Sequence, residues 1–166
     1  MTEELYRRIS APFRTEARAR VLRLVNEALT ALGYVAYPVL LIALALTGRY
    51  DLLVRAVSVP GVAFAAVTLF RKAVNAPRPY ETLDIDPLIE KDTAGRSFPS
   101  RHAFSLFMIA ATWLVAQPAV GAALVACAIV LAAVRVIGGV HYPRDVIAGA
   151  LAAAAAGLIG YVLVPW

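Results

Sequence analysis

The sequence is poor in charged residues and has a single cysteine. Of its 166 residues, 16% are charged and 61% are hydrophobic, whereas roughly 25% of the residues in an ordinary soluble domain are charged. The mean hydropathy of +0.72 agrees with this bias. The composition excludes a disordered chain and disfavours a soluble globular domain. The lone Cys127 excludes an internal disulfide framework and a multi-cysteine zinc site.

The sequence contains four long apolar runs. The runs without charge, or with Arg55 alone, are 28–47, 52–70, 103–134 and 146–166. A membrane span needs about 20 such residues. As one helix the third run would measure ~48 Å, too long for a hydrocarbon core of ~30 Å. Because Pro118 lies near its middle and proline interrupts a helix, we expect a hairpin of two helices there, over about 99–116 and 119–138.

These runs predict an all-α integral membrane protein, a bundle of about five transmembrane helices. The N-terminal segment 1–23 does not add a span, because it carries six arginines, and it does not resemble a signal peptide. Leu5, Ile9 and Phe13 recur at helical spacing, which favours an amphipathic helix at the membrane interface; a solvated cytoplasmic tail is the alternative. We expect residues 1–166 to form one membrane-embedded domain.

The polar segment 79–98 cannot cross a bilayer, because its charges and backbone groups would be unsatisfied there. No span separates Arg78 from His102, and two spans separate His102 from His141. These three residues are therefore predicted to face the same side of the membrane, and the 79–98 segment is predicted to be an active-site loop.

Both histidines stand at the start of a predicted span. In the first case Pro99 is expected to open the helix, so that the amides of Ser100, Arg101 and His102 are free to bind an anion. In the second case Asp145 follows His141 by four residues. A carboxylate bonded to one imidazole nitrogen leaves the other nitrogen basic, as a histidine nucleophile requires.

Cations surround both histidines. Arg135 precedes His141 at the end of a predicted span and is suited to bind an anion bidentately, while Arg71, Lys72 and Arg78 gather where another span ends. Together these groups predict phosphoryl transfer, in which one imidazole attacks phosphorus and the other protonates the leaving oxygen. We expect no metal and no other cofactor, because metal-ligand spacing is absent beyond these residues.

The three clusters resemble the type 2 phosphatidic acid phosphatase family of membrane lipid phosphatases, whose fold is shared with vanadium haloperoxidases. The family pattern is Lys-x6-Arg-Pro, Pro-Ser-Gly-His and Ser-Arg-x5-His-x3-Asp. The corresponding segments here are 71–79, 99–102 and 134–145, with Arg71 at the lysine position, Arg101 at the glycine and Val134 at the first serine. Either Arg71 or Lys72 fills the role of the lysine.

The resemblance implies a role for each matching residue. His141 would be the nucleophile that forms a phosphohistidine, His102 the general acid, and Asp145 the group that orients His141. The residues implied to bind phosphate are Arg71 or Lys72, Arg78, Ser100, Arg101 and Arg135. The resemblance also implies the six-helix lipid phosphatase core, to which five spans and the N-terminal helix correspond. We further hypothesise that Arg101 favours substrates with a second phosphate.

The implied substrate is a membrane lipid carrying a phosphomonoester or diphosphate, of the undecaprenyl diphosphate, phosphatidylglycerophosphate or phosphatidic acid type. No nucleic-acid partner is expected, because the net charge of +5 suits anionic lipid or phosphate. Fourteen of the 16 lysines and arginines lie on the side of the predicted site, which favours the cytoplasmic face of the cell membrane. A lipid phosphotransferase and a non-catalytic lipid-binding protein remain as alternatives.

Overall fold

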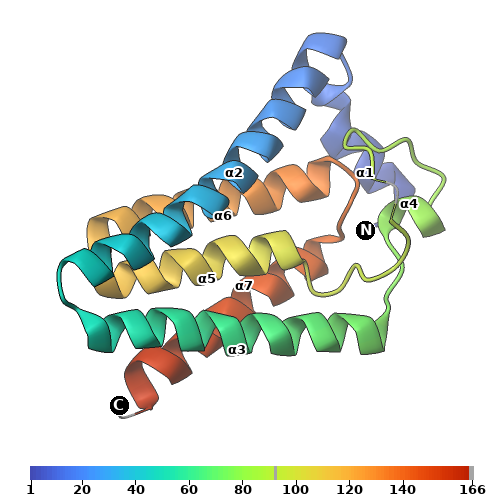
Figure 1. Ribbon diagram of the computed structural model, residues 1–166. Helices are drawn as coiled ribbons and strands as arrows, with labels where there is room; N and C mark the ends of the chain where they lie inside the picture. Colours follow the sequence, from blue (N-terminus) through green and yellow to red (C-terminus); the bar gives the residue numbers. More distant parts are fainter. Residues whose placement is uncertain (92, 165–166) are drawn as a thin grey trace.

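The computed structural model describes residues 1–91 and 93–164, and within them it is all-helical, with no strand. Its long helices pack side by side (Figure 1). In chain order the helices are α1 Glu3–Ser10, a 3-10 turn Ala11–Phe13, α2 Glu16–Leu46, α3 Tyr50–Val74, α4 Pro79–Thr82, α5 Arg101–Ala116, α6 Pro118–Ile137 and α7 Pro143–Leu158, which a π-helical turn Ile159–Leu163 extends.

The long helices confirm the predicted membrane bundle. Four of them, α2, α3, α6 and α7, are long and apolar enough to cross a bilayer, and α5 is a shorter apolar helix of 16 residues. Large apolar side chains such as Val35, Ile42 and Leu69 are exposed on their outer faces. In water such a surface would be unfavourable, whereas in a bilayer it contacts acyl chains. The chain is a multi-pass membrane protein.

The beginning of helix α2 differs from the prediction. Helix α2 begins at Glu16 rather than near residue 28, because its first three turns carry arginines that extend beyond the apolar run. Helix α7 begins at Pro143, three residues before the apolar run 146–166, since proline is favoured at the first position of a helix. The expected hairpin is confirmed: Gln117 alone separates α5 from α6.

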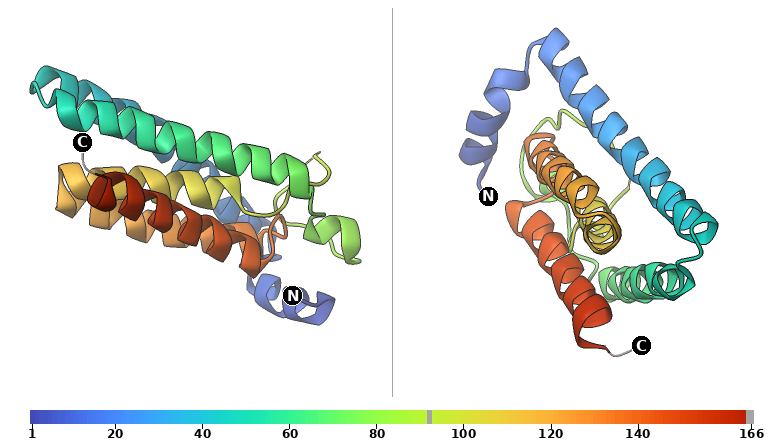
Figure 2. Two further views of the ribbon diagram at one scale, coloured as in Figure 1. Left: turned by 90° about the horizontal axis from the view of Figure 1, so that it is seen from below. Right: turned by 90° about the vertical axis from the view of Figure 1, so that its left-hand side faces the viewer.

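Helix α5 is the centre of the bundle and contacts α2, α3, α6 and α7. In the end-on view of Figure 2, α5 and α6 are surrounded by the other long helices. The buried side chains of Phe104 and Met108 pack against Val59, Ala153 and Tyr161. Helix α5 is therefore held in place by four neighbouring helices.

The prediction that Arg78, His102 and His141 lie at the same end of the bundle is also confirmed. The end of α3, the beginning of α5 and the α6–α7 connection gather at one end of the bundle, together with α1 and α4 (Figure 1). The α2–α3 turn and the α5–α6 turn lie at the opposite end, where Arg49 donates to the Ala116 carbonyl at 3.2 Å.

The N-terminal segment forms the expected short helix, but a different face of it meets the protein. Tyr6 is fully buried and donates a hydrogen bond to the Asp86 carbonyl at 3.0 Å, while Leu5 is 43% exposed. Arg14 pairs with the Asp86 carboxylate at 3.2 Å. Helix α1 is thus fixed to the segment 83–90 beside the α6–α7 connection. The main contact is made by Tyr6, which lies outside the Leu5, Ile9, Phe13 pattern.

A line of small residues brings α7 against α5. Gly149, Ala153 and Gly157 are buried along one face of α7. A Cβ atom at Gly149 would lie only 2.7 Å from the Ser100 carbonyl oxygen and 3.1 Å from the Phe104 amide nitrogen. The absence of a side chain at this position therefore sets the distance between the two helix starts that carry the predicted site.

We expect Gly149→Ala to lower the free energy of unfolding by roughly 1–3 kcal/mol, the usual cost of overpacking a well-packed core. Thermal unfolding in detergent measures the effect. The control is Gly61→Ala on α3, where a Cβ would meet nothing within 4 Å and where the higher helix propensity of alanine predicts a small stabilisation. If Gly149→Ala melts at or above the wild-type temperature, the close approach of α7 to α5 is wrong.

Candidate active site

The site forms at the end of the bundle where three segments meet: the end of α3 with residues 75–78, the loop and first turn at 95–102, and the end of α6 with residues 138–145. Each of the three predicted clusters contributes one segment. Side chains separated by up to 74 residues in the chain are thereby brought into one group.

His141 and Asp145 form a buried pair. His141 is 1% exposed, Asp145 is fully buried, and the imidazole Nδ1 lies 3.5 Å from Oδ2 of the carboxylate. Ser97 joins them: its hydroxyl donates to Asp145 Oδ2 at 2.5 Å and lies 3.3 Å from His141 Nδ1. The Nδ1 side of the ring is therefore occupied by the carboxylate and the hydroxyl, which leaves Nε2 as the nitrogen available for chemistry.

Backbone groups hold Asp145 in place. The amide of Tyr142 donates to Asp145 Oδ2 at 2.9 Å, so the carboxylate satisfies one of the free amides at the start of α7. The amide of Ser100 donates to the Asp145 carbonyl at 2.8 Å. This second bond joins the first turn of α7 to the beginning of α5 and fixes the two histidine-bearing segments relative to one another.

Burial controls the charge of His141. Desolvation lowers the pKa of its imidazole to about 4, with Arg135 and Arg78 lowering it further and the hydrogen bond with Asp145 opposing the change. Near pH 7 the ring is therefore neutral, and the lone pair on its free nitrogen is not blocked by a proton.

The beginning of α5 differs from the prediction. Pro99 lies before the helix, Ser100 is the N-cap, and Arg101 is the first helical residue. The Ser100 amide is not free, because Asp145 accepts its hydrogen bond. In contrast, the Ser100 hydroxyl is buried and has no hydrogen-bond partner within residues 1–91 and 93–164. A buried hydroxyl of this kind is costly unless a ligand satisfies it, so Ser100 presents its side chain rather than its amide.

His102 and Arg101 occupy the first turn of α5. His102 is partly exposed, and Arg135, Lys91 and His141 are close enough to interact with it electrostatically. Arg101 is exposed, and its guanidinium lies over the Phe64 ring at 5.9 Å from the centroid. Both histidines therefore lie within one cluster of positively charged side chains.

The structure separates Arg71 from Lys72. Arg71 is 7% exposed, and its guanidinium donates to the carbonyls of Arg96, Ser97 and Pro99. Lys72 is exposed on the outer side of the helix end. Of the two, Arg71 is the cation that reaches the site, where it holds the loop that carries Ser97 and Ser100.

Arg78 has a similar role in the fold. It is 3% exposed, and it donates from Nε to the Gly95 carbonyl at 3.0 Å and from Nη1 to the Val140 carbonyl at 3.1 Å. Glu81 assists by accepting hydrogen bonds from the amides of Arg78 and Gly95. Arg78 thus connects the 95–100 loop to the residue that precedes His141.

Arg135 is buried and only partly satisfied. Its side chain is 3% exposed, and Nη1 donates to the Asn26 side-chain oxygen at 3.0 Å. Nε and Nη2 are buried and have no partner among the described residues. These two nitrogens form one edge of the guanidinium, with parallel N–H groups of the kind that bind two oxygens of an anion.

Sequence reasoning missed three residues of this site. Ser97 stands two residues before the 99–102 segment, and only the packed structure shows that its hydroxyl bonds to Asp145. Asn26 is distant in the chain and belongs to none of the clusters. Lys91, in the polar loop, is half-buried beside Arg135 and Arg78, and burial together with these positive charges lowers its pKa to about 8. The signal for Lys91 in the sequence was the position of a lysine within a loop rich in acidic residues.

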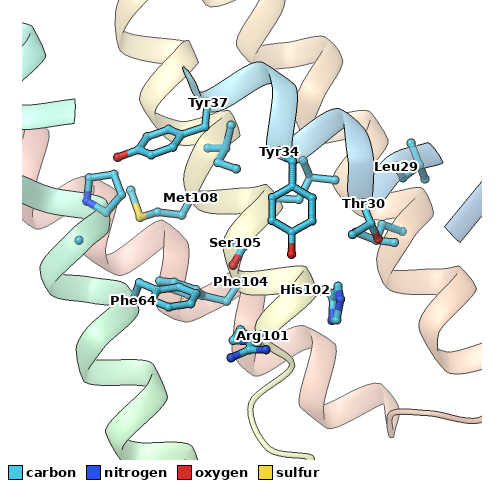
Figure 3. A pocket seen from close by; sticks show the side chains of 16 residues that line it. Leu29, Thr30, Tyr34, Tyr37, Phe64, Arg101, His102, Phe104, Ser105 and Met108 are labelled. Carbon is cyan, nitrogen blue, oxygen red and sulfur yellow. The ribbon is translucent and has the colours of Figure 1, made fainter. Parts of the chain in front are cut away.

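An apolar cavity of about 510 Å³ begins at His102 and extends between α2, α3 and α5. Figure 3 shows Arg101 and His102 at one edge, Tyr34 and Tyr37 reaching in from α2, and Phe64 from α3. Tyr34 is 77% exposed and Phe64 41% exposed, so the cavity opens between α2 and α3 on the outer surface of the bundle. Within a bilayer that surface faces lipid.

Comparison with known proteins identifies the family. The family model described as the PAP2 superfamily matches residues 52–166. The chain belongs to the PAP2 superfamily. The match includes all three motif segments and leaves α1 and the whole of α2 outside it.

Two curated relatives match a shorter part of the chain. Both are described as lipid A 1-phosphatases, from Rhizobium etli and Rhizobium johnstonii, and each is 36% identical over 86 residues, or 49% of this chain. The aligned part spans only 37% and 35% of the length of these relatives.

Solved structures agree with the fold over nearly the whole chain. LpxE from Aquifex aeolicus has a TM-score of 0.75 and 28% identity, with 96% of this chain and 93% of that chain covered. A PAP2-type phosphatidylglycerolphosphate phosphatase from Bacillus subtilis has a TM-score of 0.51 and 18% identity, with 94% and 90% covered. The second likeness concerns the fold alone. The first covers 96% of the chain and so extends into α2, which the family model does not include.

Proposed function

We propose that this protein is a membrane lipid phosphatase that hydrolyses a lipid phosphomonoester or diphosphate through a phosphohistidine. One observation carries the proposal: a neutral, buried histidine paired with a carboxylate stands among unsatisfied phosphate-binding donors, at the end of an apolar cavity open toward lipid. Family membership and the likeness to LpxE support the same conclusion.

The reaction proceeds in two steps. Nε2 of His141 attacks phosphorus and the bond from phosphorus to the lipid oxygen breaks. His102, which takes up a proton once the bound phosphate anion offsets the neighbouring cations, gives that proton to the leaving oxygen. A water molecule then attacks the phosphohistidine, gives a proton to His102, and releases inorganic phosphate with His141 restored. Asp145 holds the His141 ring through Nδ1, and Ser97 holds the carboxylate.

The phosphate oxygens are bound by donors that the fold leaves free. The Nε–Nη2 edge of Arg135 and the hydroxyl of Ser100 are buried and unpaired among the described residues, so a phosphate group would satisfy both. Donors placed in advance around a developing negative charge are a major source of catalysis. Arg71 and Arg78 supply positive charge at short range and fix the loop that presents Ser100.

The groups that face the phosphate are guanidinium, imidazole and hydroxyl groups. The Asp145 carboxylate behind His141 accepts hydrogen bonds from Ser97 and Tyr142. We therefore propose that catalysis needs no metal ion, with arginines carrying out the charge stabilisation that a divalent cation supplies in other phosphoryl-transfer enzymes.

The substrate is proposed to keep its acyl or prenyl chain in the cavity between α2 and α3 while its phosphate reaches His141. The relatives favour a lipid of the lipid A 1-phosphate type; undecaprenyl diphosphate, phosphatidylglycerophosphate and phosphatidic acid complete the candidate set. Because α2 lines the cavity and α1 is fixed beside the site, we propose that residues 1–166 act as one domain, with 79–98 as its active-site loop.

The decisive experiment is a phosphate-release assay on purified protein, with EDTA present, across these four lipids. We expect turnover of at least one lipid, inhibition by vanadate, and loss of turnover by about three orders of magnitude or more in His141→Ala, because the nucleophile is removed. The melting temperature of the variant serves as the control for folding. Full activity in His141→Ala would contradict the proposal, and a requirement for Mg²⁺ would contradict its metal-free mechanism.

Arg101 is the site residue in which this chain departs most from the family pattern. Its guanidinium lies at the cavity edge next to His102, on the path between the bound phosphate and the lipid-facing opening. This position suits a second anionic group of the substrate, so we propose that Arg101 favours diphosphates over monophosphates.

We expect Arg101→Gly to lower the ratio of kcat/KM for a polyprenyl diphosphate to that for the monophosphate with the same chain. A loss of roughly tenfold is expected, the usual effect of one charge-assisted hydrogen bond. Arg101→Lys retains the positive charge and should keep most of the preference. An unchanged ratio in Arg101→Gly would refute the assignment.

We propose that the site faces the cytoplasm. The N-terminal arginines, which take no part in phosphate binding, lie at the end of the bundle that carries the site (Figure 1), and basic residues near spans favour the cytoplasmic side.

Labelling of single cysteines in intact cells tests the orientation. In a Cys127→Ala background, a membrane-impermeant maleimide should label Thr47→Cys, which is exposed at the opposite end of the bundle, and should not label Glu90→Cys, which is exposed in the active-site loop. Labelling of Glu90→Cys without labelling of Thr47→Cys would place the site outside the cell.

A further inference from the structure

Asn26 lies in α2, which the family model does not match. It nevertheless accepts a hydrogen bond from the side chain of Arg135, from Nη1 to Oδ1 at 3.0 Å across 109 positions of sequence. Because arginine has donors only, the amide of Asn26 must present its oxygen to the guanidinium, and the orientation of both groups is fixed by this one bond.

The geometry of Arg135 shows what the bond achieves. Nη1, the nitrogen bound by Asn26, lies apart from the Nε–Nη2 edge, and that edge is buried and unpaired among the described residues. A guanidinium held at Nη1 is restricted in rotation, so its free edge keeps one direction. Without this hold, the long side chain has other rotamers available, and ordering it costs free energy when the anion binds.

The chemistry of the partner also matters. An aspartate at this position would neutralise the guanidinium and compete with the anion, whereas the amide oxygen of Asn26 is a neutral acceptor. The full positive charge of Arg135 therefore stays available to a phosphate group. The buried side of α6 offers no carboxylate to Arg135 in the contacts of the described chain, and Asn26 from α2 takes that place.

We infer that Asn26 is a positioning residue, which aims the Nε–Nη2 edge of Arg135 at the transferred phosphoryl group. The inference deepens the proposed function and rests on it. Helix α2 thus contributes to phosphate binding as well as to the lipid cavity, and a chain limited to the matched family region would lack this part of the site.

The test measures vanadate binding by calorimetry, which does not depend on turnover, and kcat/KM on the lipid that the phosphate-release assay identifies. We expect Asn26→Ala to weaken vanadate binding by roughly tenfold, the usual effect of losing a hydrogen bond to a charged group. The control is Glu27→Ala, the next residue of α2, which is exposed and should leave vanadate affinity within about twofold.

A double-mutant cycle separates positioning from a general structural effect. In an Arg135→Lys background a cation remains, but the flat fork that Asn26 orients is gone, so Asn26→Ala should change vanadate affinity by less than about twofold. An equal loss in both backgrounds, or unchanged affinity in Asn26→Ala alone, would overturn the inference. Wild-type protein that binds vanadate but releases no phosphate from any lipid would overturn the proposed function and leave the binding result for Asn26 standing.

Discussion

The site depends on Asp145, which is joined at once to three parts of the chain. Its carboxylate accepts hydrogen bonds from Ser97 and from the Tyr142 amide and lies beside His141, while its carbonyl accepts a bond from the Ser100 amide. A fully buried carboxylate would be costly without such partners. With them, one residue fixes the tautomer of a histidine and the distance between two helix starts. The close contact at Gly149 makes that distance possible.

The buried arginines have two different roles. Arg71 and Arg78 are largely satisfied by backbone carbonyls and hold the 95–100 loop in place. Arg135 is satisfied on one side by Asn26 and keeps a pair of donors that have no partner in the described part of the chain. Burying several like charges close together is unfavourable, and a phosphate anion relieves both the repulsion and the unsatisfied donors. The charges and free donors of the protein without ligand therefore favour the binding of a phosphate anion.

The bilayer explains why a reaction of a charged group takes place at the end of an apolar bundle. The outer surface is apolar and matches acyl chains, while the charged side chains of the site gather at the end of the bundle where α3 and α6 end and α5 begins. The cavity connects these two environments, because it starts at His102 and opens between α2 and α3. A lipid phosphate has the same division along its length, with an apolar chain and an anionic head.

The sequence by itself determined the class of fold, the hairpin at Gln117, the common side of Arg78, His102 and His141, and the family, because apolar length, helix parity and motif spacing are local properties of the chain. It did not determine that α5 begins at Arg101, that Arg71 rather than Lys72 turns inward, or that Ser97, Lys91 and Asn26 belong to the site. Those facts follow from contacts between distant segments: the carbonyl of Asp145 takes the Ser100 amide, and Asn26 meets Arg135 across 109 residues. Which polar groups remain unpaired, and are therefore available to a ligand, is decided only when all the helices are packed, because pairing is a property of the assembled neighbours.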